Sequence, residues 1–359
     1  MNRLPGPTSS PSGVDPLHAI ASAPPQFGPG EVAHVLQHEY GLQGSLSLLV
    51  SERDQNFRLT TDGGIQYVVR IANAAEERVN TDFQVDALLC LERGDCPVNV
   101  PRIQPTLAGD NTASIVNGDT RHFLRVVSYV PGKPLAEIAL NRTLARRLGV
   151  TLAALAAGLR EFRHPGESPA LLWDMQRAVG LRPMLAYIAD AELRTVVSDC
   201  LDDFELRVLP QLAALRHQVI HSDFNPGNVL INDDAQELAG VIDFGDILYA
   251  PLIVDVAIAA SYLRHFDGNP ALYIAPFVAG YDGHTSLTQA ELALLYDLIR
   301  TRLATTITLL WWRLAARDES DPYRRQALDA ESGAHQFLIG LNAIPRDDFL
   351  SLIIAACGR

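Results

Sequence analysis

Short apolar runs alternate with polar turns in the first third of the chain, which is the pattern of β-strands. Three such runs, rich in Val, Leu and Ile, cover residues 45–51, 56–60 and 66–71, and an Asp-Gly-Gly turn precedes the third. The sequence therefore predicts an antiparallel meander of three strands. The spacing of apolar residues also predicts a helix before the meander, a helix after it and a later strand, at residues 30–40, 82–91 and 120–130.

Leucines recur three and four positions apart after residue 140, which is the spacing of an amphipathic helix. The stripe consists of Leu144, Leu148, Leu152, Leu155, Leu159 and Phe162. Further helices are predicted at residues 189–203, 204–215, 254–260, 270–281, 289–316 and 322–341. Short Val- and Ile-rich runs at 218–220, 229–231 and 240–242 interrupt them and predict a strand hairpin flanked by polar loops.

A strand-rich part followed by a larger helical part predicts an α+β fold. A chain of 359 residues is long enough to favour two lobes over a single core. We expect a small N-terminal lobe with an antiparallel sheet at residues 30–130 and a mainly helical C-terminal lobe at 131–359. Residues 1–29 are rich in proline and lack a central apolar block, so we expect a disordered tail without a signal peptide.

The charge and the cysteines argue against several classes of protein. A net charge of −13 disfavours a general binder of nucleic acids or of anionic membranes, because such surfaces need an excess of Lys and Arg. The four cysteines are scattered without Cys-x-x-Cys spacing, which favours reduced thiols in a cytoplasmic protein over a zinc site or a disulfide framework. The longest apolar segment, Leu303 to Ala316, is shorter than a membrane span.

Two polar loops carry the candidate chemistry. The first reads His221-Ser-Asp-Phe-Asn-Pro-Gly-Asn228, and the second reads Val241-Ile-Asp-Phe-Gly-Asp246. Phosphoryl transfer needs an acceptor for the substrate hydroxyl proton and oxygen ligands for Mg²⁺. In this interpretation Asp223 orients and deprotonates the alcohol, while Asn228 and Asp243 hold the metal, with the spacing of a kinase catalytic loop and its Asp-Phe-Gly.

The two loops resemble the aminoglycoside phosphotransferase and choline kinase superfamily, whose fold is that of protein kinases. Three further segments are most similar to the hydroxylysine kinase branch; they are Ser51–Phe57, Arg125–Gly132 and Leu172–Asp174. The resemblance implies that residues 30–130 bind the nucleotide and that the C-terminal lobe holds the catalytic groups and the acceptor. It also implies that Asp255 braces the catalytic loop from behind.

The resemblance assigns the nucleotide contacts, with two departures from the family. Arg70 stands where these kinases carry a phosphate-binding Lys, and Gln84 stands where the acidic partner of that Lys is expected. The turn before the second strand has no glycine, so Ser51, Gln55 and Asn56 are the candidate phosphate donors. Backbone groups from Val127 to Tyr129 would meet the base, which leaves ATP and GTP as alternatives.

The acceptor pocket is predicted between the catalytic loop and the C-terminal helices. Asp246 is a candidate contact for a substrate amine, although a structural role is an equal alternative. Basic and aromatic residues of the helices are candidates for a substrate carboxylate or ammonium, with Arg302 and Trp311 foremost among Arg300, Arg302, Trp311, Trp312 and Arg313.

The favoured function is a small-molecule kinase that uses Mg²⁺ and ATP or GTP to phosphorylate an amino alcohol, with 5-hydroxylysine as the first candidate. An aminoglycoside, homoserine or choline acceptor is the nearest alternative. A nucleotide-binding regulator with little turnover is an alternative of another class, motivated by Arg70 and Gln84. The sequence leaves the oligomeric state open.

Overall fold

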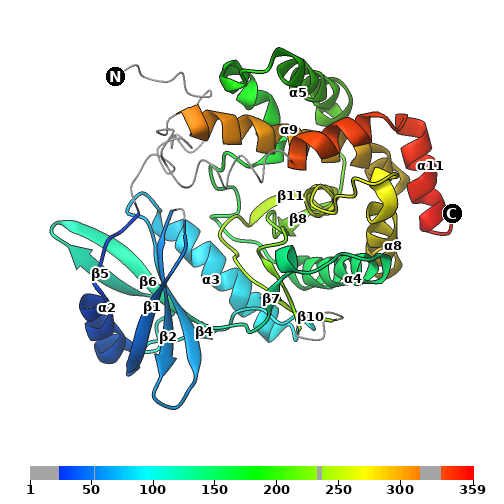
Figure 1. Cartoon of the computed structure of the whole chain (residues 1–359). Helices are drawn as coiled ribbons and strands as arrows, with labels where there is room; N and C mark the ends of the chain where they lie inside the picture. Colours follow the sequence, from blue (N-terminus) through cyan, green and yellow to red (C-terminus); the bar gives the residue numbers. More distant parts are fainter. Residues whose placement is uncertain (1–23, 52, 233–236, 316–332) are drawn as a thin grey trace.

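The computed structural model describes residues 24–51, 53–232, 237–315 and 333–359. They form two lobes, a smaller one built on a six-stranded sheet and a larger one that is mainly helical (Figure 1). The predicted α+β fold with two lobes is confirmed. Within the described residues, no helix is both long and apolar enough to cross a membrane.

The sheet of the small lobe is antiparallel. Its strands are β1 (Gly44–Leu49), β2 (Gln55–Thr61), β3 (Gln66–Ile71), β4 (Ile103–Gln104), β5 (Ala113–Asn117) and β6 (Thr120–Ser128). Their order is β1-β2-β3-β6-β4, and β5 pairs with the first half of β6. The predicted meander is confirmed, whereas β4 and β5 were missed because β4 has two residues and β5 buries only Ile115.

Helix α2 (Pro29–Val35) and the π-turn η1 (Leu36–Tyr40) cover one face of this sheet. The alternating apolar residues of the strands pack against them in a separate core. Phe27 belongs to this core, and its backbone N–H and C=O pair with the side chain of Gln55 at 2.8 and 3.0 Å. The small lobe therefore starts at or before residue 27, earlier than the predicted residue 30, and residues 1–23 lie outside the described part.

Helix α3 (Arg78–Arg93) lies on the other side of the sheet and joins the two lobes (Figure 1). Its buried residues Phe83, Leu88 and Leu91 belong to the same continuous core as the helices of the large lobe. The ring of Phe83 stacks on that of Phe162, with centroids 5.8 Å apart. The helix thus fixes the small lobe against the large one.

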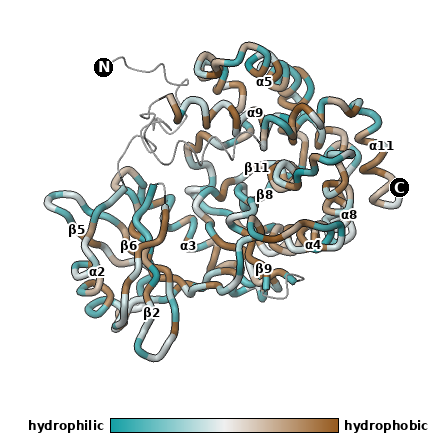
Figure 2. Tube along the Cα trace, viewed as in Figure 1, coloured by the Kyte–Doolittle hydropathy of each residue, from teal (hydrophilic) through white to brown (hydrophobic). Residues whose placement is uncertain are grey.

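The core of the large lobe is built around α4 (Arg142–Leu159), in which the five leucines of the predicted stripe are buried. Phe162, the last residue of that stripe, lies beyond the end of the helix and is half-buried. Figure 2 shows hydrophobic residues gathered along α4 and the strands beside it. Helix α8 (Ile274–His284) packs on α4 with backbone contact, because a Cβ atom on Gly149 would lie 1.9 Å from the oxygen of Phe277. The other long helices are α5 (Ala191–Asp203), α7 (Leu252–Ala260), α9 (Gln289–Ala315) and α11 (Arg346–Ala356).

Several predicted helices differ in detail. The stretch 204–215 is a π-turn, η4 (Phe204–Val208), followed by the single turn α6 (Leu209–Leu212), and 270–281 begins with the 3-10 turn η5 (Pro270–Leu272). The 3-10 segment η3 (Met175–Tyr187), the turn η2 (Leu135–Glu137) and α11 were not predicted. Residues 333–342 are helical, and the rest of the predicted helix 322–341 lies outside the described residues.

Two small sheets position the polar loops. Strand β8 (His217–Ile220) pairs with β11 (Leu248–Pro251), and β9 (Val229–Ile231) pairs with both β10 (Leu238–Val241) and β7 (Lys133–Pro134). The loop with Asp223 runs from β8 to β9, and the loop with Asp243 runs from β10 to β11. Both loops therefore cross between the same two sheets and lie side by side.

Candidate active site

A buried carboxylate fixes the shape of the loop that carries Asp223. The backbone N–H groups of His221 and Ser222 donate to the two oxygens of Asp255, at 3.0 and 2.8 Å. Ser222 has a φ of 63°, a left-handed conformation that is costly for a residue with a side chain. Burial raises the pKa of Asp255 to about 6, while the two N–H groups favour its charged form. The expected bracing role of Asp255 is confirmed by these contacts.

His221 connects the two polar loops. Its Nδ1 accepts a hydrogen bond from the backbone N–H of Asp223 at 3.3 Å, and its Nε2 lies 3.1 Å from the carbonyl oxygen of Ile242. Because Nδ1 accepts, Nε2 carries the ring proton and donates a hydrogen bond to that oxygen. Burial lowers the pKa of the ring, which keeps it neutral. His221 therefore sets the distance between the loops and is not placed as a base.

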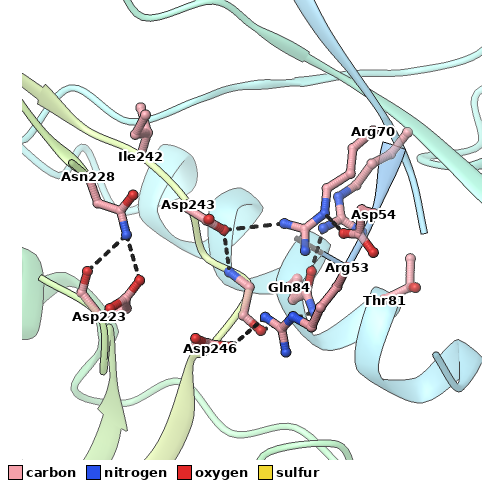
Figure 3. A network of polar contacts seen from close by, with 12 residues as sticks. Arg53, Asp54, Arg70, Thr81, Gln84, Asp223, Asn228, Ile242, Asp243 and Asp246 are labelled. Atoms are coloured by element: carbon pink, nitrogen blue, oxygen red, sulfur yellow. Dashed lines mark hydrogen bonds and ion pairs between the residues drawn. The ribbon is translucent and has the colours of Figure 1, made fainter. Parts of the chain in front are cut away.

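Asp223 and Asn228 face each other across the first loop. The Nδ2 group of Asn228 donates to Oδ2 of Asp223 at 2.7 Å and to its backbone oxygen at 3.0 Å. The amide oxygen of Asn228 consequently points toward Asp243 (Figure 3). Burial raises the pKa of Asp223 to about 7; the charge of Asp246 adds to this effect and Arg302 opposes it. A carboxyl with such a pKa is suited to accept a proton from an alcohol.

Asp243 lies on the neighbouring loop with its side chain half exposed. Its φ of 60° is again left-handed, and its Oδ1 accepts from the backbone N–H of Gly245 at 3.1 Å. Together Asp243 and Asn228 present two oxygen donors of the kind that hard divalent cations prefer. The described residues hold no group of three or more His, Cys, Asp or Glu placed for a metal.

The partner of Arg70 differs from the one predicted. Its Nε donates to Asp54 Oδ2, and its Nη1 lies 3.4 Å from Asp243 Oδ1. Gln84 instead accepts from Arg125 and donates to the carbonyl oxygen of Gly245 at 3.5 Å. The predicted pairing of Arg70 with Gln84 is thus wrong. Burial opposes the charge of Asp54, but Arg70 and Arg125 outweigh it and lower the pKa of its carboxyl.

A second arginine of the small lobe reaches the loop of Asp243. Nη2 of Arg53 lies 2.6 Å from Oδ1 of Asp246, so two ion pairs cross between the lobes (Figure 3). Burial opposes the charge of Asp246, but Arg53, Arg302 and Arg70 together outweigh burial and lower the pKa of that carboxyl. Each aspartate of this loop is therefore balanced by one arginine of the small lobe.

Two cavities meet at these residues. A polar cavity of about 440 Å³ is lined by Asp223, Asp246 and Arg302, and a more apolar one of about 460 Å³ is lined by Val127, Tyr129 and neighbours. They share five residues, which are Val50, Asn56, Arg70, Asn228 and Asp243. Asp223 lines only the polar cavity, so it lies on one side of the shared residues. Val127 and Tyr129, where the resemblance implies the hinge between the lobes, lie on the other side.

The comparisons with known proteins agree with this arrangement. A profile of the phosphotransferase enzyme family matches residues 46–294, which include Arg70 and both polar loops. The chain belongs to this phosphotransferase family. Hydroxylysine kinase of Mus musculus is 26% identical over an alignment of 330 residues, gaps included, that covers 84% of this chain and 87% of that protein.

Solved structures share the fold of this phosphotransferase. A microcompartment-associated aminopropanol kinase superposes with a TM-score of 0.70 at 22% identity, over 90% of this chain and 100% of that one. An amicoumacin kinase in complex with AMP-PNP, Ca²⁺ and Ami superposes with a TM-score of 0.65 at 16% identity, over 89% and 95% of the two chains. The predicted membership of this superfamily is confirmed, and the chain is a small-molecule kinase with an alcohol group as acceptor.

The phosphotransferase site includes most of the residues that the sequence singled out. Ser51 and Asn56 line the polar cavity with Arg302, and Val127 and Tyr129 line the apolar one. The backbone N–H of Tyr129 already donates to Gln66 at 3.1 Å, so that group is occupied within the sheet. The amide of Gln55 is turned away, toward Phe27, and its predicted phosphate contact finds no support in this geometry.

The tryptophan that lines the polar cavity is Trp173, whereas the predicted Trp311 packs on the hydrophobic core. The guanidinium groups of Arg302 and Arg313 each lie 5.1 Å from the ring centroid of Trp173. Trp173 belongs to the Leu172–Asp174 segment, which the sequence marked only by its resemblance. Arg300 pairs with Asp203 and Asn342, and it does not line this cavity.

Asp54 was also missed by the sequence, although one signal pointed to it. The register of β2 and β3 places Asn56 opposite Arg70, so an acid two residues before Asn56 lies within reach of the guanidinium. The resemblance to the family instead predicted a partner for Arg70 on the following helix, at Gln84.

We expect Asp255→Ala to destabilise the protein. The change leaves two buried N–H groups without an acceptor, so the free energy of unfolding should fall by about 2–5 kcal/mol. Asp255→Asn keeps one acceptor oxygen and should lose less. Chemical denaturation followed by circular dichroism measures both, with Asp347→Ala, at an aspartate whose side chain is 94% exposed, as the control. An Asp255→Ala protein as stable as the parent would contradict the bracing role.

We expect Asp54→Asn to raise the KM for nucleotide about tenfold, because Arg70 loses a charge-assisted hydrogen bond that orients it. Gln84→Leu should change this KM less, since Gln84 does not contact Arg70. Steady-state kinetics at saturating acceptor, with melting temperatures to check folding, separates the two variants. The reverse order of effects would restore Gln84 as the functional partner.

Proposed function

We propose that this kinase transfers the γ-phosphate of ATP or GTP to the hydroxyl group of a small amino alcohol, and that 5-hydroxylysine is the acceptor. The observation that carries the proposal is the meeting of the two cavities at Arg70, Asn228 and Asp243, with Asp223 on the polar side only. A nucleotide in the apolar cavity would present its terminal phosphate at the shared residues. An acceptor in the polar cavity would then face that phosphate with Asp223 beside its hydroxyl.

The roles of the residues follow from this placement. The acceptor oxygen attacks the γ-phosphorus, the bond from that phosphorus to the β-phosphate oxygen breaks, and the hydroxyl proton goes to Asp223. Asn228 and Asp243 would hold Mg²⁺, which neutralises charge on the phosphates when it is bound. Arg70, oriented by Asp54, contacts the phosphates from the small lobe.

The charges of the polar cavity support an acceptor with both an ammonium and a carboxylate. Its described lining contains four arginines and four aspartates, so it lacks the acidic excess that a polycationic aminoglycoside requires. Arg302 is 2% exposed, and its Nη2 donates to the hydroxyl of Tyr262 at 3.2 Å. Among the described residues, its Nε and Nη1 have no hydrogen-bond partner. A buried guanidinium with two free donors fits a carboxylate.

The similarity to hydroxylysine kinase from Mus musculus also supports this acceptor. The alternative of a regulator with little turnover loses its motivation, because Arg70 has an acidic partner in Asp54 and does not depend on Gln84.

The first test concerns the base and the metal ligand. We expect Asp223→Asn to lower kcat at least about 100-fold while the affinity for Mg-nucleotide stays within about threefold, because Asp223 acts on the acceptor. Asp243→Asn should weaken both. Turnover assays and nucleotide titrations measure these effects. If Asp223→Asn turned over as fast as the parent, the assignment of the base would be wrong.

The second test concerns the acceptor. We expect kcat/KM for 5-hydroxylysine to exceed that for choline, for kanamycin and for 1,5-diaminopentan-2-ol at least about tenfold, with ATP and GTP tested in parallel. The last compound keeps both amines and the hydroxyl and lacks only the carboxylate. Arg302→Gln should erase the preference for hydroxylysine over it, since a charge-assisted contact in a desolvated site is worth about 1.5–3 kcal/mol.

Arg300→Gln is the control for this test, because Arg300 lies on the same helix and pairs outside the cavity. Equal or better turnover of choline or kanamycin would refute hydroxylysine as the acceptor and leave the kinase chemistry intact.

A further inference from the structure

The turn between β1 and β2 replaces a glycine-rich phosphate loop with an arginine. Residues 50–54 contain no glycine, so their backbone lacks the conformational freedom with which such loops approach phosphates closely. The turn does place Arg53 in the polar cavity, together with Asp223, Asn228 and Asp243. A long cationic side chain is therefore available where backbone N–H groups would usually meet the phosphates.

The backbone of Arg53 is held by hydrogen bonds, whereas its guanidinium group is only partly buried. The backbone oxygen of Arg53 accepts from Asn73 Nδ2 at 3.0 Å, and the next residue, Asp54, accepts from the backbone N–H of Asn73 at 3.0 Å. The side chain of Arg53 is 34% exposed, and within the described part of the chain its guanidinium pairs with Asp246, 2.6 Å away. The main chain is thus anchored, and the guanidinium can exchange partners by rotation of the side chain.

The position of Arg53 relative to the cavities identifies the phosphate that it can reach. Arg70 lines both cavities, whereas Arg53 does not line the apolar one. Arg53 therefore lies on the acceptor side of the shared residues, where the terminal phosphate of a nucleotide would face the acceptor. The α- and β-phosphates would lie on the far side, toward the hinge.

In this structure Asp246 is paired with the guanidinium of Arg53, and another cation could replace that guanidinium. An acceptor ammonium has the same charge as the guanidinium and fits the same carboxylate. Once displaced, Arg53 would lose its counter-ion inside the polar cavity. The γ-phosphate of a bound nucleotide could then supply the missing negative charge, because the arginine fork matches phosphate oxygens.

We propose that Arg53 is a mobile ligand of the γ-phosphate: it rests on Asp246 in the free enzyme and moves to the phosphate when the ammonium of an acceptor takes Asp246. The proposal rests on the proposed function, because it needs an amine-bearing acceptor. It couples the two substrates, so that binding of the acceptor completes the phosphate site.

The experiment measures this coupling directly. Binding of a non-hydrolysable ATP analogue and of ADP is titrated with and without saturating lysine, which is 5-hydroxylysine without the reactive hydroxyl. For the parent protein we expect lysine to tighten the triphosphate about fivefold or more and to change ADP less than about twofold. Arg53→Ala should lose this coupling and lower kcat about 100-fold, and Arg53→Lys should retain part of both.

Arg78→Ala is the matched control. Arg78 also lies in the small lobe, but its side chain is 57% exposed and its pair with Asp82 is outside the cavity. It should behave as the parent protein does. In Asp246→Asn we expect the affinity for lysine to fall about tenfold, because the ammonium loses its counter-charge.

Several results would overturn the proposal. They are undiminished coupling in Arg53→Ala, equal coupling with ADP and with the triphosphate, and absence of coupling in a parent protein that phosphorylates hydroxylysine. Equal weakening of ADP and triphosphate by Arg53→Ala would show a purely structural ion pair. If the parent phosphorylates another amine instead, lysine is replaced by the deoxy form of that acceptor. If it phosphorylates no amine at all, the proposed function fails first and the role of Arg53 fails with it.

Discussion

The carboxylate of Asp255 holds the catalytic loop, and the rest of the site depends on this contact. Its two oxygens accept the N–H groups of His221 and Ser222 and so maintain a left-handed residue directly before Asp223. His221 then links this loop to the carbonyl oxygen of Ile242 beside Asp243. One buried acid thus fixes the position of Asp223, and one neutral histidine links its loop to the loop of Asp243. The strain at Ser222 is offset by these buried hydrogen bonds.

The small lobe meets these loops through arginines of its first three strands and their turns. Arg70 contacts Asp54 and Asp243, and Arg53 contacts Asp246, so each acid of the metal loop has a cation from the other lobe. In this arrangement the acid that orients Arg70 lies on the neighbouring turn, not on helix α3. The helix keeps a structural role instead, because Gln84 binds Arg125 and the carbonyl oxygen of Gly245 while Phe83 packs into the large lobe.

The acceptor side of the site combines charge with aromatic surface. The ring of Trp173 lies 5.1 Å from the guanidinium groups of both Arg302 and Arg313, and Tyr262 accepts from Arg302. Nη2 of Arg302 also lies 3.6 Å from Oδ1 of Asp223, while its Nε and Nη1 have no hydrogen-bond partner among the described residues. This mixture of charges fits the zwitterionic acceptor proposed above better than a polycation.

Local patterns in the sequence determined much of this protein. Val- and Ile-rich runs predicted the meander, the leucine stripe predicted α4, and the spacing of Asp223, Asn228 and Asp243 predicted the reactive loops, because such features depend on neighbouring residues alone. The partners of Arg70 and the aromatic ring of the acceptor cavity were decided only by the tertiary structure. Asp54 reaches Arg70 through strand register, and Trp173 reaches Arg302 across about 130 residues of chain. Contacts between distant segments depend on how the layers pack, and neither propensity nor spacing within one segment encodes that packing.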